Sequence, residues 1–151
     1  MKKDIVILIA EDNAGHFQLI KKNLWLTCVD HDILQFKNGK EILNFLFKTD
    51  TEIYLEEDKK YVLLLDIRMP QVDGLEVLKK IKDDQKLRKI PVIMLTTTSD
   101  ASMIRQCYEL GCSYYIVKPV DYHYFMEAVQ NLGEFLSLES MRLPSVSENS
   151  D

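Results

Sequence analysis

The chain has 151 residues, 46% of them hydrophobic and 28% charged, which are ordinary values for one globular domain with a sizeable core. Its net charge of −5 argues against a nucleic-acid-binding surface, which would normally be basic. No apolar run reaches the about 18 residues that a membrane-spanning helix needs, so no membrane segment is predicted.

The amino-terminal segment combines a basic start with a short apolar run at residues 5–10. Acidic residues follow at once and no small-residue cleavage site is present, so this run is predicted to be a strand and not a signal peptide. The three cysteines are odd in number and lack zinc-ligand spacing, which favours a reduced, cytoplasmic location. The three histidines are scattered, which argues against a metal site built on them.

Five apolar runs of strand length follow one another, at residues 5–10, 33–36, 61–65, 91–95 and 114–117. All but 33–36 are continuous, the pattern of parallel strands covered on both faces, whereas 33–36 is weaker and is predicted to lie at an edge. Helical spacing marks the intervening and final segments, through Phe17, Ile20 and Leu24; Ile42, Phe45 and Leu46; Leu75, Leu78 and Ile81; Met103, Cys107 and Leu110; and Phe125, Val129, Leu132 and Leu136. This alternation predicts an α/β fold with a doubly wound parallel sheet.

Two segments fall outside this alternation. Residues 48–60 are charged and long for a connection between a helix and a strand, so they are predicted to form a surface insertion. Residues 140–151 are polar and too short to fold alone, so they are predicted to be a flexible tail after one domain over residues 1–139. No second domain, and therefore no DNA-binding domain, is predicted.

Carboxylates follow two of the predicted strands: Glu11 and Asp12 after 5–10, and Asp66 after 61–65. Ligands of open parallel sheets bind beyond the carboxyl ends of strands, so these side chains converge if the two strands are neighbours. Asp12 or Asn13 could alternatively cap the first helix. Three converging carboxylates would repel one another unless a cation lay between them, and Mg²⁺ prefers such oxygen ligands.

Two further strand ends carry groups that suit an anion. Thr96 follows 91–95, and Lys118 with Pro119 follows 114–117. A hydroxyl and an ammonium at this edge could hold a phosphoryl group. The peptide bond between Lys118 and Pro119 is also a candidate cis bond, which would swing the lysine inward.

This ordered set resembles the receiver domains of two-component response regulators over residues 4–138. The matching positions are Glu11 and Asp12, Asp66, Thr96, Lys118 with Pro119, the switch aromatic Tyr115, and the turn residues Pro70, Asp73 and Gly74. The resemblance implies a flavodoxin-like (βα)5 fold with strand order 2-1-3-4-5.

The resemblance also implies a mechanism, in which Asp66 accepts a phosphoryl group from a sensor histidine kinase. Lys118 would pair with the phosphoryl oxygens, and Thr96 and Tyr115 would move as the switch. The implied Mg²⁺ ligands are Glu11, Asp12, Asp66 and the backbone carbonyl of Arg68. Such a domain is a phosphoacceptor and not a turnover enzyme on a separate substrate.

A narrower likeness concerns the partners. The segments at residues 11–20 and 118–136 resemble single-domain regulators that serve phytochrome-type and related sensor kinases. Apolar residues of the last helix fill an arc of roughly 180°, whereas covering a sheet needs about 100°. We therefore expect a homodimer through the fourth helix, fifth strand and fifth helix, with Met126 or Phe135 exposed in the monomer.

Three alternatives remain at this point. An aspartyl phosphatase of the haloacid-dehalogenase type generally needs a second Asp two residues after the first, where this chain has Arg68. A flavodoxin-like cofactor carrier needs a phosphate-cradling loop after the first strand, where Glu11 and Asp12 would repel phosphate. A degenerate receiver that only binds partners would have lost signature residues, and all of them are present.

Overall fold

The computed structural model describes residues 5–27, 32–139 and 146. Its five strands form one parallel sheet in the order β2-β1-β3-β4-β5, which confirms the expected fold and strand order. The strands are β1 (Ile5–Ala10), β2 (Asp32–Phe36), β3 (Lys60–Leu65), β4 (Val92–Thr96) and β5 (Tyr114–Val117). The weak run predicted as an edge strand is β2, at one edge of the sheet.

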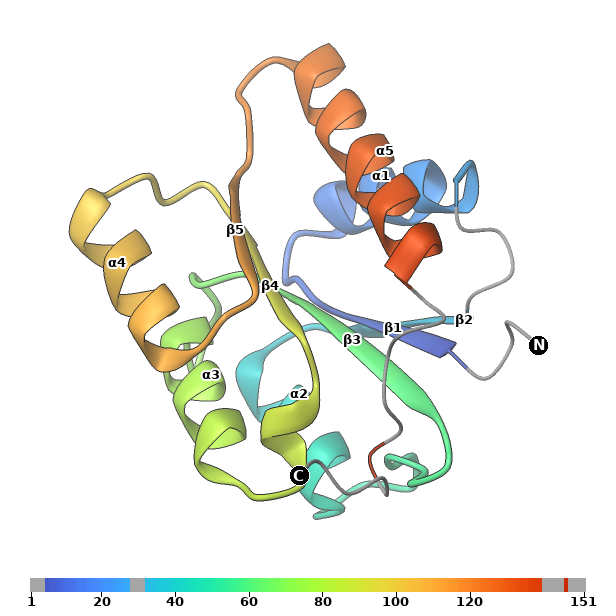
Figure 1. Ribbon diagram of the computed structural model, residues 1–151, viewed down its shortest axis with the longest axis vertical. Coiled ribbons are helices and arrows are strands. Elements are labelled where there is room, and N and C mark those ends of the chain that lie inside the picture. Colours follow the sequence, from blue (N-terminus) through green and yellow to red (C-terminus); the bar gives the residue numbers. More distant parts are fainter. Residues whose placement is uncertain (1–4, 28–31, 140–145, 147–151) are drawn as a thin grey trace.

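Helices cover both faces of the sheet (Figure 1). The helices are α1 (Ala14–Trp25), α2 (Gly39–Phe47), α3 (Gly74–Asp83), α4 (Ala101–Leu110) and α5 (Tyr122–Glu139), with a short 3-10 turn, η2 (Leu87–Lys89). Helices α1 and α5 lie on one face, and α2, α3 and α4 lie on the other. Within the described part of the chain, no helix is long and apolar enough to cross a membrane.

The continuous apolar strands are explained by this double cover. Along β1, Ile7 and Ile9 belong to the apolar cluster under α1 and α5, whereas Val6 and Leu8 belong to the cluster under α2 and α3. Successive side chains of a strand point to opposite faces, so a strand covered on both faces is apolar at every position. The result is a rigid central sheet whose strand ends are held in fixed positions.

The insertion before β3 is anchored rather than wholly superficial. Leu55, within the charged segment 48–60, is buried in the cluster under α2 and α3, and its N–H donates to the Phe45 carbonyl (3.3 Å). Val146 is buried in the same cluster. The remainder of the tail predicted at residues 140–151 lies outside the described residues.

Candidate functional site

The predicted polar groups gather because β1 and β3 are neighbours. Ala10 pairs with Leu65 at the end of both strands, and the Asp66 N–H donates to the Ala10 carbonyl (3.1 Å). Strand β4 follows β3, and β5 follows β4, with the Lys118 N–H donating to the Thr96 carbonyl (2.7 Å). The carboxyl ends of these strands therefore bring Glu11, Asp66, Thr96 and Lys118 to one edge.

The three carboxylates form an acidic cluster. Glu11, Asp12 and Asp66 each offer an oxygen within 4.8 Å of the others. Glu11 is only 2% exposed and Asp66 only 7%, while Asp12 is exposed. Asn13, and not Asp12, caps α1, because its side chain accepts from the His16 N–H (2.9 Å). Asp12 is thus free for another role, and the hard oxygen donors of this cluster fit Mg²⁺.

Burial sets the electrostatics of the cluster. It raises the pKa of Glu11, because the charged carboxylate loses its hydration, and the nearby Asp66 adds to this rise. The Lys118 ammonium acts in the opposite direction. Two buried carboxylates with one ammonium between them leave an excess of negative charge, which a divalent cation would offset.

Lys118 is the basic member of the site and is 5% exposed. Its Nζ donates to Glu11 Oε1 and to Asp66 Oδ2, the latter at 3.2 Å. No cis peptide bond occurs in the part of the chain that the structure describes, so the candidate cis bond between Lys118 and Pro119 is not found there. A trans bond suffices, because the end of β5 already directs the lysine toward the ends of β1 and β3.

The two switch candidates lie beside this cluster. Thr96 is fully buried, and its Oγ1 accepts from the Thr98 N–H (3.4 Å). The Tyr115 hydroxyl donates to the Thr98 carbonyl (2.6 Å), so both residues contact the loop that leads into α4. Burial raises the pKa of Tyr115 to about 12, so the phenol remains a hydrogen-bond donor at neutral pH.

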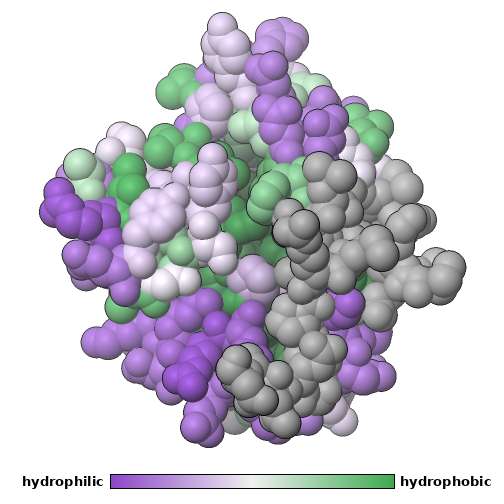
Figure 2. Space-filling model, in the orientation of Figure 1, coloured by the Kyte–Doolittle hydropathy of each residue, from purple (hydrophilic) through white to green (hydrophobic). Residues whose placement is uncertain are grey.

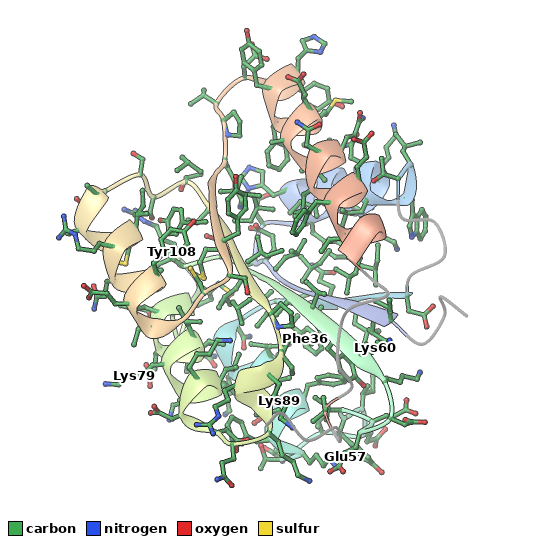
Figure 3. The ribbon with its side chains drawn as sticks, in the orientation of Figure 1. Phe36, Glu57, Lys60, Lys79, Lys89 and Tyr108 are labelled. Atoms are coloured by element: carbon green, nitrogen blue, oxygen red, sulfur yellow. The ribbon has the colours of Figure 1, made fainter. Side chains whose placement is uncertain are left out.

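A second tie joins Tyr115 to α4. Its backbone N–H donates to the hydroxyl of Tyr108 (3.0 Å), which lies on the side of α4 that faces β5 (Figure 3). Tyr115 therefore contacts α4 and the loop before it through both its backbone and its side chain.

The turn after Asp66 is fixed by backbone contacts. The Arg68 N–H donates to Asp66 Oδ1 (3.4 Å), and the Gly74 N–H donates to the Ile67 carbonyl (2.7 Å). A Cβ at Gly74 would lie 2.1 Å from the Asp66 carbonyl oxygen, so only glycine permits this close return. Asp73 caps α3 by accepting from the Glu76 N–H (3.0 Å). The role of the Arg68 carbonyl remains a prediction.

His16 is a site residue that the sequence analysis missed. Its Nδ1 lies 3.2 Å from Lys118 Nζ and 3.9 Å from Glu11 Oε2. Burial lowers the pKa of His16, and the Lys118 charge lowers it further. The available signal was its place in the first turn of the helix that follows the acidic pair, where a side chain remains near the strand end.

Comparison with known proteins identifies the family. The sequence model of one protein family, the response regulator receiver domain, matches residues 7–130. The chain belongs to this receiver-domain family. It is 31% identical over 140 residues to the response regulator Rcp1 of Synechocystis sp., covering 93% of each chain.

Solved structures of receiver domains have the same fold. A response regulator receiver domain from Rhodospirillum rubrum superposes with a TM-score of 0.85 at 38% identity, covering 93% of this chain and 97% of that one. The phosphorylated cyanobacterial phytochrome response regulator RcpA gives 0.82 at 31% identity, covering 93% and 98%. The Mn²⁺-bound form of Rcp1 gives 0.76 at 29% identity, covering 96% and 99%.

Proposed function

We propose that this chain is a single-domain response regulator that accepts a phosphoryl group on Asp66. The observation that carries the proposal is a buried Asp66 carboxylate that contacts the Lys118 ammonium and shares an acidic cluster with Glu11 and Asp12. A nucleophile, a cation that faces it and oxygen ligands for a metal are the groups that phosphoryl transfer requires.

The reaction would proceed from phosphohistidine on a sensor histidine kinase. A carboxylate oxygen of Asp66 attacks the phosphorus, the P–N bond breaks, and its electron pair stays on the imidazole nitrogen, which takes up a proton. Lys118 pairs with the transferred oxygens, and the Thr96 hydroxyl donates to one of them. Bound Mg²⁺ would neutralise phosphoryl charge, with Glu11, Asp12, Asp66 and the Arg68 backbone carbonyl as its ligands.

The conformational output would start at Thr96. Once its hydroxyl turns toward the phosphoryl group, the space beside it opens to the Tyr115 ring. Moving Tyr115 breaks the bond from its hydroxyl to the Thr98 carbonyl (2.6 Å) and so loosens the loop before α4. The local charge change thereby alters the surface around α4, β5 and α5.

The partners follow from the relatives and from composition. RcpA is named as a phytochrome response regulator, which supports a phytochrome-type sensor kinase as the phosphodonor. The two cysteines in the described part of the chain, Cys107 and Cys112, are both free thiols and buried, which agrees with a cytoplasmic protein.

Phosphorylation can be tested directly by intact-mass measurement. Wild type incubated with Mg²⁺ and acetyl phosphate or phosphoramidate should gain one phosphoryl group, and Asp66→Asn should gain none. Retained labelling of Asp66→Asn would reject Asp66 as the acceptor. An unlabelled wild type, under conditions that label a known receiver, would favour a phosphorylation-independent binding module instead.

The second part of the proposal is a homodimer through the face formed by α4, β5 and α5. Phe135 of α5 is 52% exposed, as the apolar arc of that helix predicts, and Tyr122 of α5 is exposed too. Tyr114 and Val117 of the neighbouring β5 are also exposed. Figure 2 views this side, where hydrophobic and weakly polar side chains lie between α4 and α5. A groove of about 670 Å³ between β5 and α5 adds concave apolar surface.

Self-association is tested by light scattering of wild type and Phe135→Glu. A specific dimer buries on the order of 800 Å² per partner, which this face could supply. Wild type should be dimeric, more so with beryllofluoride and Mg²⁺, and Phe135→Glu should be monomeric with an unchanged melting temperature. Lys79→Glu, on α3 away from this face, is the control. A monomeric wild type in both states would assign the face to another protein.

A further inference from the structure

His16 is a third partner of the Lys118 ammonium. The other two partners, Glu11 and Asp66, are carboxylates, whereas His16 contributes a ring nitrogen, Nδ1, at 3.2 Å. An ammonium has donors and no acceptor, so Nδ1 must accept and the ring proton must lie on Nε2. The three donors of Lys118 are thus matched to two charged acceptors and one neutral acceptor.

Two independent contacts hold the imidazole in this place. The backbone N–H of His16 donates to the side chain of the helix cap Asn13 (2.9 Å), which fixes the first turn of α1. The ring itself packs against Phe125 of α5, with centroids 5.9 Å apart and planes tilted by 46°. The contact with Lys118 therefore depends on the joint placement of α1, β5 and α5.

The three acceptors differ in what happens to them during phosphoryl transfer. Asp66 becomes the reacting group, and Glu11 belongs to the oxygen set assigned to the cation. The Asp66 carboxylate therefore becomes the phosphorylated group, and the Glu11 carboxylate would share its charge with the cation, so both attract the ammonium less. His16 is neither the reacting group nor a proposed ligand of the cation, so its neutral Nδ1 remains an acceptor for Lys118.

We propose that His16 is a positioning residue that holds the Lys118 ammonium beside Asp66 while the two carboxylates are engaged elsewhere. This inference rests on the proposed phosphoacceptor function. A neutral acceptor suits the task, because it orients the ammonium by one hydrogen bond and leaves its charge for the phosphoryl oxygens. A carboxylate at the same place would compete with those oxygens for the ammonium.

Two variants separate the hydrogen bond from the packing of the ring. His16→Phe keeps an aromatic ring against Phe125 and removes the acceptor. His16→Asn removes the ring and keeps an acceptor oxygen close to the position of Nδ1. A purely structural role would make His16→Asn the more damaging change, whereas a positioning role makes His16→Phe the more damaging one.

The rate of phosphorylation by phosphoramidate at saturating Mg²⁺ is the first measurement. His16→Phe should be slower on the order of tenfold, the effect of losing one hydrogen bond to a charged group. His16→Asn should stay within about twofold of wild type, on the same reasoning. An equal rate for His16→Phe and wild type, or a slower His16→Asn, would overturn the proposal.

A second measurement uses wild type alone, so it depends neither on the folding of a variant nor on the phosphorylation reaction. Long-range ¹H–¹⁵N correlation spectra of wild type should show His16 as the neutral tautomer protonated at Nε2, and a ring protonated at Nδ1 would also overturn the proposal. Failure of the proposed phosphoacceptor function can be told apart from this. It would appear as a wild type that gains no phosphoryl group, or as an Asp66→Asn variant that still gains one. A labelled wild type with an unaffected His16→Phe rejects only the role of His16.

Discussion

Two regions of the described chain bury polar side chains, and they do so in opposite ways. At the strand ends, the buried residues are Glu11, Asp66, Thr96 and Lys118. Between α1 and α5, the buried polar residue is the neutral Asn23. Its Nδ2 donates to the Leu19 carbonyl (2.8 Å), and its Oδ1 accepts from Gln130 Nε2 (2.8 Å).

The difference separates a polar contact that is neutral and fully paired from one that carries unbalanced charge. Asn23 has a partner at both ends of its amide and bears no charge, so its burial costs little and fixes how α1 meets α5. The strand-end cluster holds more negative than positive charge out of water, which lowers stability unless a cation binds. The proposed phosphoacceptor function gives a physical reason for keeping such a cluster.

The largest effect is expected from breaking the charged cluster at Lys118. Lys118→Met removes the ammonium between Glu11 and Asp66, and EDTA removes any metal ion. The free energy of unfolding should then fall by about 3 kcal/mol, because two buried carboxylates face each other without a positive partner. Urea denaturation measures this, and added Mg²⁺ should restore part of the loss.

Lys82 offers a matched control for this experiment. Its Nζ is also part-buried but donates only to the carbonyls of Arg88 and Ile90 in the described structure, at 3.0 and 3.1 Å. Lys82→Met should therefore cost about 1 kcal/mol and should not respond to Mg²⁺. Equal losses in the two variants would mean that Lys118 serves packing alone.

The next effect concerns the cation itself. An ion that binds only the folded state stabilises it by about 2.7 kcal/mol at a hundredfold excess over its dissociation constant. Mg²⁺ should therefore raise the melting temperature of wild type clearly, that of Asn23→Leu by the same amount, and that of Asp12→Asn by less. If Asp12→Asn responds like wild type, Asp12 is no ligand.

The smallest effect is expected at the neutral contact. Asn23→Leu should lower the free energy of unfolding by about 1–2 kcal/mol, because the Gln130 amide loses its partner. The double variant Asn23→Leu with Gln130→Leu should recover much of this loss, and phosphorylation should be unchanged in both. Failure of the double variant to recover would show that shape, and not hydrogen bonding, selects Asn23.

Much of this arrangement could be predicted from sequence, because the end of each strand is visible there as the point where an apolar run meets a polar residue. Continuous apolar runs ending in Glu11, Asp66, Thr96 and Lys118 predict both the sheet and the edge where ligands bind. The strand order came with the family resemblance, since the alternation of elements alone does not specify which strands are neighbours.

What escaped prediction depends on three-dimensional packing. The contact of His16 with Lys118 joins the first turn of α1 to the end of β5, two segments about a hundred residues apart in the sequence. Leu55 is one of three consecutive apolar residues in a charged segment, and only the path of the whole insertion buries Leu55 and leaves Ile53 and Tyr54 exposed. The trans bond before Pro119 is a property of the backbone that the dipeptide does not determine.

The hydroxyl of Tyr108 has one more consequence, because β5 is an edge strand of the sheet. Exposed edge N–H groups are templates on which foreign strands can assemble into aggregates. Tyr108 occupies the N–H of Tyr115, so a foreign strand cannot bond there unless α4 first moves away. At this position of the β5 edge, α4 thus withholds the Tyr115 N–H from a foreign strand, and the side chains beside it remain exposed for the proposed dimer contact.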